Sequence, residues 1–294
     1  MKQLLHSGSL EYGVAGEVSL RWAAVDLTPV VEEARERHDL SPIAAVALGR
    51  AMAGATLLLR LSARASRRLT LTVHGDGPIG KIVAEVDSEG NLRGLVGEPQ
   101  IEPPTVLPTD PQIGLRIAGA VGRGILRVRR ELVDGSSYES QVGLESGEIG
   151  LDLAHFLEQS EQTQSVVMVG VLEGPEGIRA AGGMIVEVMP GAREDAVEQL
   201  EENLARIGGV SRTLGRGGLA ELRDQVLQGL EPELMDRREV RFRCSCSREG
   251  LLGSLVGLPP EDLDAIRDDD GRVEAQCSYC GARYLYQKGE LATS

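Results

Sequence analysis

The feature of the sequence that most constrains the fold is a set of four cysteines, all of which lie beyond residue 243 of a 294-residue chain. They form two close pairs, Cys244-Ser245-Cys246 and Cys277-Ser278-Tyr279-Cys280. Four thiolates complete the tetrahedral shell of Zn²⁺ at about 2.3 Å each, and Gly281 allows the chain to turn after the second pair without a Cβ clash. The spacing therefore predicts one zinc ion held by Cys244, Cys246, Cys277 and Cys280.

The four-cysteine pattern restricts what such a zinc site can do. A catalytic zinc is disfavoured, because four cysteines leave no open position for water. A structural zinc with no further role is one interpretation of the spacing. A redox switch is favoured by the chemistry, because zinc-bound thiolates are already deprotonated and therefore nucleophilic towards oxidants. Once zinc leaves, each close pair can form its own disulfide, Cys244 with Cys246 and Cys277 with Cys280.

The composition restricts the partners and the compartment. The net charge is −14 and the pI is about 4.9, so nucleic acids and anionic membranes would repel the chain. The residues that follow Met1 contain no apolar stretch long enough for a signal peptide, and we expect a cytoplasmic protein. Because the cytosol keeps thiols reduced, clustered cysteines there indicate metal binding or redox chemistry rather than a disulfide framework.

The most membrane-like segment is Pro42 to Leu61, which carries Arg50 near its centre. It opens with Ser41-Pro42, a good cap and first-turn pair for a helix in a soluble protein. We predict a buried helix here and no membrane partner.

Residues 1–190 predict a large amino-terminal domain of mixed α and β structure. Leu69, Leu71 and Val73 alternate with polar residues, which is the two-residue period of a half-buried strand. Glycine-containing turns between strands indicate hairpins, and hairpins imply an antiparallel sheet and an α+β fold. The expected helices are Pro29 to Arg37, Pro42 to Leu61 and Ile149 to Gln159. The expected strands are Gly16 to Trp22, Leu69 to His74, Lys81 to Val86, Ile125 to Leu132, Tyr138 to Leu144, Val166 to Leu172 and Ile178 to Val188.

Residues 191–236 predict an amphipathic helical linker. Two apolar stripes with helical spacing are separated by glycines at 208–209, 215 and 217–218. One interpretation is a pair of ordinary surface helices between domains. The other is a metastable element, because helices this short are marginal without a docking partner. In the second case the stripes are candidate client-binding residues, namely Val197, Leu200, Leu204, Ile207, Leu219, Leu222, Val226 and Leu230.

Residues 237–294 predict a small zinc-binding domain. A unit of this length is small for an independent core and usually needs a metal or disulfides. Ser247 is placed to cap a helix, and Pro259-Pro260 begins another. Asp268 to Gly271 predicts a turn, and Tyr284 to Tyr286 a closing strand.

Gly75 to Gly80 matches the dinucleotide pattern G-x-G-x-x-G, and with Lys81 it nearly matches a phosphate loop. Both patterns need a helix next, so that its amide dipoles meet the phosphates. Here residues 82–86 have the composition of a strand. We therefore predict a hairpin turn and no nucleotide cofactor.

The whole pattern resembles the heat shock protein 33 family, the redox-regulated holdase chaperones of about 33 kDa. The order and spacing of several motifs carry this resemblance: Phe242 to Ser247, Cys277 to Gly281, Gly75 to Gly80, Ser146 to Gly150, Gln159 to Gln162, and Ala181 to Pro190. The resemblance implies an amino-terminal α+β domain, a helical linker that senses folding and a zinc domain. It also implies ATP-independent binding of unfolding proteins under oxidative stress, with zinc release and homodimerisation on activation. By the motif match, Cys277 and Cys280 would be oxidised first, and Cys244 and Cys246 after the linker unfolds.

Two other classes compete with this interpretation. A zinc-ribbon nucleic-acid-binding protein would share the cysteine pattern, but the low pI argues against it. An enzyme would need a convergent catalytic set, and we can name none in this sequence, so we expect no enzyme.

Overall fold

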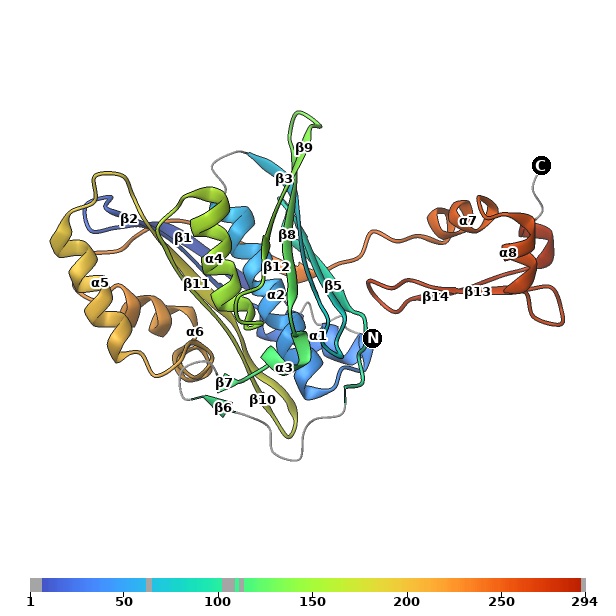
Figure 1. Cartoon of the computed structure of the whole chain (residues 1–294), viewed down its shortest axis with the longest axis horizontal. Helices are drawn as coiled ribbons and strands as arrows, with labels where there is room; N and C mark the ends of the chain where they lie inside the picture. Colours follow the sequence, from blue (N-terminus) through green and yellow to red (C-terminus); the bar gives the residue numbers. More distant parts are fainter. Residues whose placement is uncertain (1–6, 62–64, 102–108, 111–113, 292–294) are drawn as a thin grey trace. The chain divides into compact units, whose positions relative to one another are not determined.

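The computed structural model describes residues 7–61, 65–101, 109–110 and 114–291 (Figure 1). The prediction of no signal peptide concerns the amino terminus, of which residues 1–6 lie outside the described residues. The chain forms two compact units, one that ends at Phe242 and one that begins at Arg243. Each unit is described below by itself.

The first unit is built on one ten-stranded sheet with the strand order β10-β11-β2-β1-β12-β5-β4-β3-β8-β9. Neighbouring strands pair antiparallel, except that β12 and β5 pair in parallel through Arg241 and Phe242. The predicted α+β class with an antiparallel sheet is therefore confirmed. The strands are β1 (Ser7–Ala15), β2 (Leu20–Asp26), β3 (Ser66–Gly75), β4 (Lys81–Asp87), β5 (Asn91–Val96), β8 (Gly124–Leu132), β9 (Ser137–Gly143), β10 (Ser165–Gly174), β11 (Gly177–Val188) and β12 (Glu233–Phe242). A short pair, β6 (Thr109–Asp110) and β7 (Gly114–Leu115), forms a separate two-stranded sheet.

The first unit also contains the predicted helices. Helix α1 spans Thr28–His38, α2 spans Pro42–Leu61 and α4 spans Ile149–Glu161. A one-turn helix, α3 (Ala118–Val121), was not predicted. Among the described helices, α2 alone is long and apolar enough to cross a membrane, and 89% of its most apolar window is buried inside the protein.

Arg50, a charged residue in the middle of α2, is neutralised by Glu148, the residue that precedes α4. Arg50 Nη1 donates to Glu148 Oε2 at 2.7 Å, and both side chains are at most 2% exposed. The other oxygen of Glu148 accepts from the backbone amides of Ile117 and Ala118. Because a buried charge is tolerated only when it is paired and hydrogen-bonded, this network explains how Arg50 fits a core helix.

The predicted strand from Gly16 to Trp22 is wrong in its bounds. Residues 16–19 form the turn between β1 and β2, and Gly16, Glu17 and Val18 all have positive φ. A left-handed backbone cannot continue a strand, so the strand begins at Leu20. The preceding strand β1 was not predicted.

Gly75 to Gly80 forms the predicted turn between the antiparallel strands β3 and β4. The carboxylate of Asp76 accepts from the amide of Arg123 at 2.7 Å. A Cβ on Gly77 would lie 2.3 Å from the carbonyl oxygen of Ala120. The glycine is thus required by close packing of the turn on α3.

The two predicted linker helices are present as α5 (Glu194–Arg206) and α6 (Val210–Val226). Gly209 caps α6 with φ 102°, and Gly218 kinks it with φ 65° and ψ −157°, whereas Gly215 lies within the helix. Both helices pack on the β2–β11 face around Trp22 and Met184. Because side chains alternate across a strand, the buried Ala23 and Val25 face the other side of the sheet.

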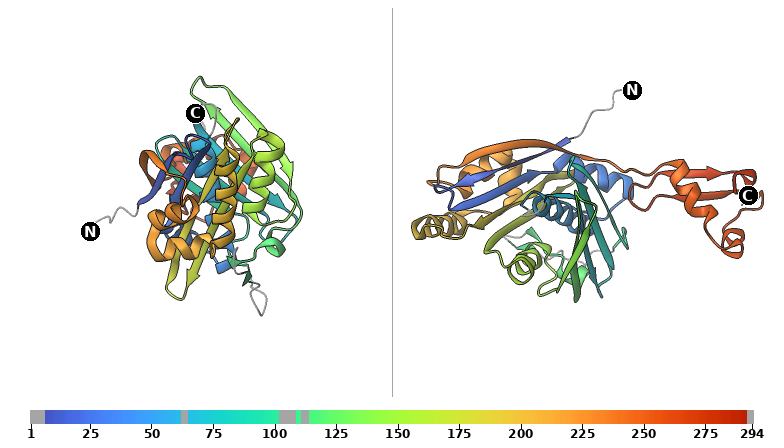
Figure 2. Two further views of the ribbon diagram at one scale, coloured as in Figure 1. Left: turned by 90° about the vertical axis from the view of Figure 1, so that its left-hand side faces the viewer. Right: turned by 90° about the horizontal axis from the view of Figure 1, so that it is seen from above.

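The boundary between the two compact units lies after Phe242 rather than after residue 236. The reason is that β12 pairs along its length with β1, from Val14↔Glu233 to Ser7↔Arg241, and so belongs to the large sheet. A functional division of the first unit into residues 1–190 and a regulated linker, 191–236, stays a prediction. Figure 2 shows α5, α6 and β12 from two further sides.

Candidate metal centre

The second cysteine pair lies in the turn of a hairpin in the small unit. Strands β13 (Val273–Gln276) and β14 (Arg283–Tyr286) pair antiparallel and form a two-stranded sheet. The Cys277 carbonyl accepts from the Gly281 amide at 2.8 Å, and the Cys277 amide donates to the Ala282 carbonyl at 2.9 Å. Gly281 has φ 70°, as the Cβ argument predicts. This turn holds Cys277 and Cys280 at 8% and 5% exposure.

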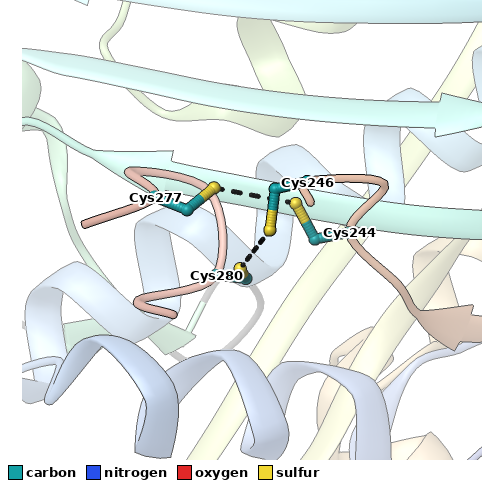
Figure 3. Close-up of side chains that lie close together, drawn as sticks. All are labelled: Cys244, Cys246, Cys277 and Cys280. Atoms are coloured by element: carbon teal, nitrogen blue, oxygen red, sulfur yellow. Dashed lines mark hydrogen bonds between the residues drawn. The ribbon is translucent and has the colours of Figure 1, made fainter. Parts of the chain in front are cut away.

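The first cysteine pair lies between β12 and α7 (Arg248–Val256). The predicted cap is present, because the Gly250 amide donates to Ser247 Oγ at 3.0 Å. Cys244 and Cys246 are half-buried. Ser247, the residue that follows Cys246, is thus held at the start of α7. The side chains of Cys244 and Cys246 point toward Cys277 and Cys280 (Figure 3).

The four sulfur atoms form one cluster. All lie within 4.8 Å of one another, with 3.8 Å between Cys244 and Cys277 and 3.4 Å between Cys246 and Cys280. A tetrahedron with metal–sulfur bonds of 2.3 Å has edges of about 3.8 Å. A disulfide would need about 2.05 Å, so these separations fit a shared metal ion. The structure therefore brings together all four predicted ligands in an arrangement that could hold a metal.

Burial of the cluster opposes charge on the sulfurs. Desolvation by burial raises the pKa of both Cys277 and Cys280. The hydroxyl of Tyr284 lies 3.5 Å from Cys246 Sγ, and this hydrogen bond raises the pKa of Tyr284 to about 12. A divalent cation bound by the four sulfurs would instead favour their thiolate form.

The apolar core around the cluster is small. Its buried members are Leu255, Leu263, Val273, Tyr286 and Leu291. Helix α8 (Pro260–Ala265) begins at the predicted Pro259-Pro260 pair. The hydroxyl of Tyr286 donates to the Arg248 carbonyl at 2.8 Å. A core of this size supplies little stability by itself, so a metal ion would contribute a large share.

The eight predicted client-binding residues belong to the first unit, where they lie on α5, on α6 and in the segments that follow these helices. Leu200, Leu219, Leu222, Val226 and Leu230 are buried in the cluster around Trp22, and Leu204 and Ile207 pack against it. Val197 is half-buried. Leu204 and Ile207 also line a cavity of about 260 Å³ between α4, β10 and the start of α6. Five of the eight residues are therefore buried, whereas Val197, Leu204 and Ile207 are partly exposed.

The sequence did not indicate two features of the structure. The sequence predicts a closing strand at Tyr284, but the approach of Tyr284 to Cys246 depends on the fold of the hairpin. In the sequence Glu148 is only one residue of a motif, although in the structure it neutralises Arg50, which is far away in the sequence. The one available signal was the charge of Arg50 within an apolar helix, which required a partner.

The fold and site define a two-unit α+β protein whose smaller unit contains a cluster of four cysteines that could hold a metal ion. A family model described as Hsp33 protein matches residues 9–287, and the chain belongs to this family.

The 33 kDa chaperonin of Thermus thermophilus is 44% identical over 97% of this chain and 85% of its own length. That of Clostridioides difficile is 38% identical over 89% of both chains. The crystal structure of the Thermotoga maritima 33 kDa chaperonin, with 34% identity, has a TM-score of 0.87 and covers 97% of this chain and 96% of its own. The names of these relatives support a chaperone function.

Proposed function

We propose that this chain is a redox-regulated, ATP-independent holdase chaperone of the cytoplasm. In the proposed reduced state, one Zn²⁺ per chain is held by Cys244, Cys246, Cys277 and Cys280, and the protein is inactive. Disulfide formation and zinc release activate it to bind unfolding proteins under oxidative stress, as a homodimer. The observation that carries the proposal is the single cluster of four sulfurs within 4.8 Å, in a family whose relatives are named chaperonins.

The proposed switch is the oxidation of each cysteine pair by a peroxide. Bound Zn²⁺ keeps the sulfurs deprotonated and therefore reactive. A cysteine thiolate attacks one peroxide oxygen and the O–O bond breaks. Hydroxide departs as the leaving group, and the cysteine becomes a sulfenic acid. The second thiolate of the pair attacks that sulfur, the S–S bond forms, and a second hydroxide leaves. Each pair thus gives two electrons to one peroxide, and a disulfide can no longer act as two thiolate ligands.

Loss of zinc is proposed to expose the client-binding surface. Structural zinc contributes about 10–16 kcal/mol of apparent folding free energy, whereas whole domains are stable by about 5–15 kcal/mol. The small unit is therefore expected to unfold after oxidation. We propose that α5 and α6 then undock from the β2–β11 face, and that their uncovered leucines bind exposed apolar segments of clients.

The alternative of a zinc-ribbon nucleic-acid-binding protein is less well supported. The segment from Arg243 to Ser294 holds nine acidic side chains against six basic ones. Affinity for a nucleic-acid backbone comes mainly from an excess of basic groups. The charge of the small unit thus favours the chaperone proposal, and suppression of client aggregation by the oxidised protein tests it.

Oxidation by peroxide with mild heat is expected to release zinc and to create the local disulfides Cys244–Cys246 and Cys277–Cys280. All four sulfurs lie within 4.8 Å of one another, so the cluster itself does not select a pairing. In a segment without fixed structure, closing a ring across residues 247–276 costs about 2 kcal/mol more than closing a local one. Peptide mapping of the oxidised protein, with an untreated sample as control, measures the linkage. Predominant Cys246–Cys277 linkage would contradict the local pairing.

A further inference from the structure

Tyr284 extends from the hairpin to the metal centre. Its strand β14 is fixed by pairing with β13, where Tyr284 lies opposite Ala275. Residues two apart in a strand share a face, and Tyr286 on the same face is buried in the small core. Tyr284 packs against that core and reaches the cluster with its hydroxyl, 3.5 Å from Cys246 Sγ. The ring is thus held by packing while the hydroxyl contacts a ligand atom.

At this position the Tyr284 hydroxyl can donate a hydrogen bond to the sulfur of a thiolate ligand. A phenol O–H is a hydrogen-bond donor, and a metal-bound thiolate is a charged acceptor. A donor in this place stabilises negative charge on the sulfur and lowers its nucleophilicity. Groups that contact metal ligands in this way change metal affinity by roughly 10–100-fold. Cys246 is half-buried, so small oxidants can reach it and its own reactivity matters.

We propose that Tyr284 is a positioning residue of the metal centre, whose hydroxyl donates a hydrogen bond to the Cys246 thiolate. This bond strengthens the hold on the metal and slows the attack of Cys246 on peroxide. Tyr284 therefore sets how much oxidant is needed before the ion is released. The inference rests on the proposed function, because it assigns a residue to the same switch.

The test compares two phenylalanine variants of the full chain. Tyr284→Phe keeps the packed ring and removes the donor to Cys246. Tyr286→Phe removes a hydroxyl from the same strand, but that hydroxyl donates to the Arg248 carbonyl and so reports general loss of stability. The measurements are zinc affinity by competition with a chromophoric chelator, the rate of zinc release by hydrogen peroxide, and the alkylation of Cys246 relative to Cys277 by mass spectrometry.

The Tyr284→Phe variant is expected to bind zinc about 10-fold more weakly, to release it faster at a fixed peroxide concentration, and to be alkylated faster at Cys246 relative to Cys277. The Tyr286→Phe variant is expected to keep the wild-type ratio of alkylation between these two cysteines. Wild-type affinity and alkylation in Tyr284→Phe, or an equal change in both variants, would overturn the role of Tyr284. A wild-type protein that binds no zinc would instead overturn the proposed function.

Discussion

Replacing any one of the four cysteines with serine is expected to remove zinc and to unfold the small unit. Each sulfur supplies one of four ligands, and zinc contributes about 10–16 kcal/mol to structural sites of this kind. The small core of five buried side chains cannot replace a contribution of this size. Metal analysis per chain and hydrogen exchange of β13 and β14 measure the two effects. We expect less than one zinc per chain and loss of amide protection in residues 243–291, while the strands of the large sheet stay protected.

Ser278→Ala is the matched control for these variants. Ser278 is exposed and lies in the same turn, between Cys277 and Cys280. The control should therefore keep its zinc and its exchange pattern. Full zinc retention in any two of the single cysteine variants would contradict a site with four ligands.

A double substitution, Leu204→Asp with Leu222→Asp, is expected to change both redox states of the protein. Leu222 is fully buried in the cluster around Trp22, and Leu204 packs against that cluster. Loss of a buried leucine alone costs about 2–5 kcal/mol, and a buried unpaired charge adds to this. In the reduced protein, amides in α5 and α6 should exchange at least ~30-fold faster, since 2 kcal/mol corresponds to such a factor.

The same variant should capture clients poorly once it is oxidised. Apolar contact area stabilises a complex by about 25 cal/mol per Å², and aspartate removes that area from both stripes. Ala205→Asp with Ala220→Asp is the matched control, because both alanines are exposed on the same two helices. If the leucine variant exchanges and protects clients as the wild type does in both redox states, α5 and α6 are only a tether. Client binding would then lie elsewhere on the large unit.

The elements that could be predicted from sequence are those with strong local signals. Helix α2 has the predicted bounds, because Ser41-Pro42 begins it and an apolar run continues to Leu61. Ser247 caps α7 as its residue type predicts. One cysteine pair lies in the turn between β13 and β14, and the other precedes α7. Because the two sulfurs of each pair are already close, a single contact between these two segments brings all four together.

The elements that were missed depend on contacts between distant residues. Strand β12 contains Asp236, Arg237, Arg238 and Glu239, and most of it is exposed, so it shows little apolar alternation. It becomes a strand through its pairing with β1. For the same reason the sequence gives no local signal that the large sheet extends to Phe242. The contact between Tyr284 and Cys246 likewise has no local signal.

The central claim is that oxidation converts an inactive, zinc-bound protein into a holdase. Light scattering of a chemically unfolded client, diluted into buffer without ATP, tests this most directly. The zinc-loaded reduced protein should leave the aggregation of the client unchanged, whereas the peroxide-treated protein should suppress it at stoichiometric amounts. Equal suppression by both forms, or suppression by neither, would contradict the claim.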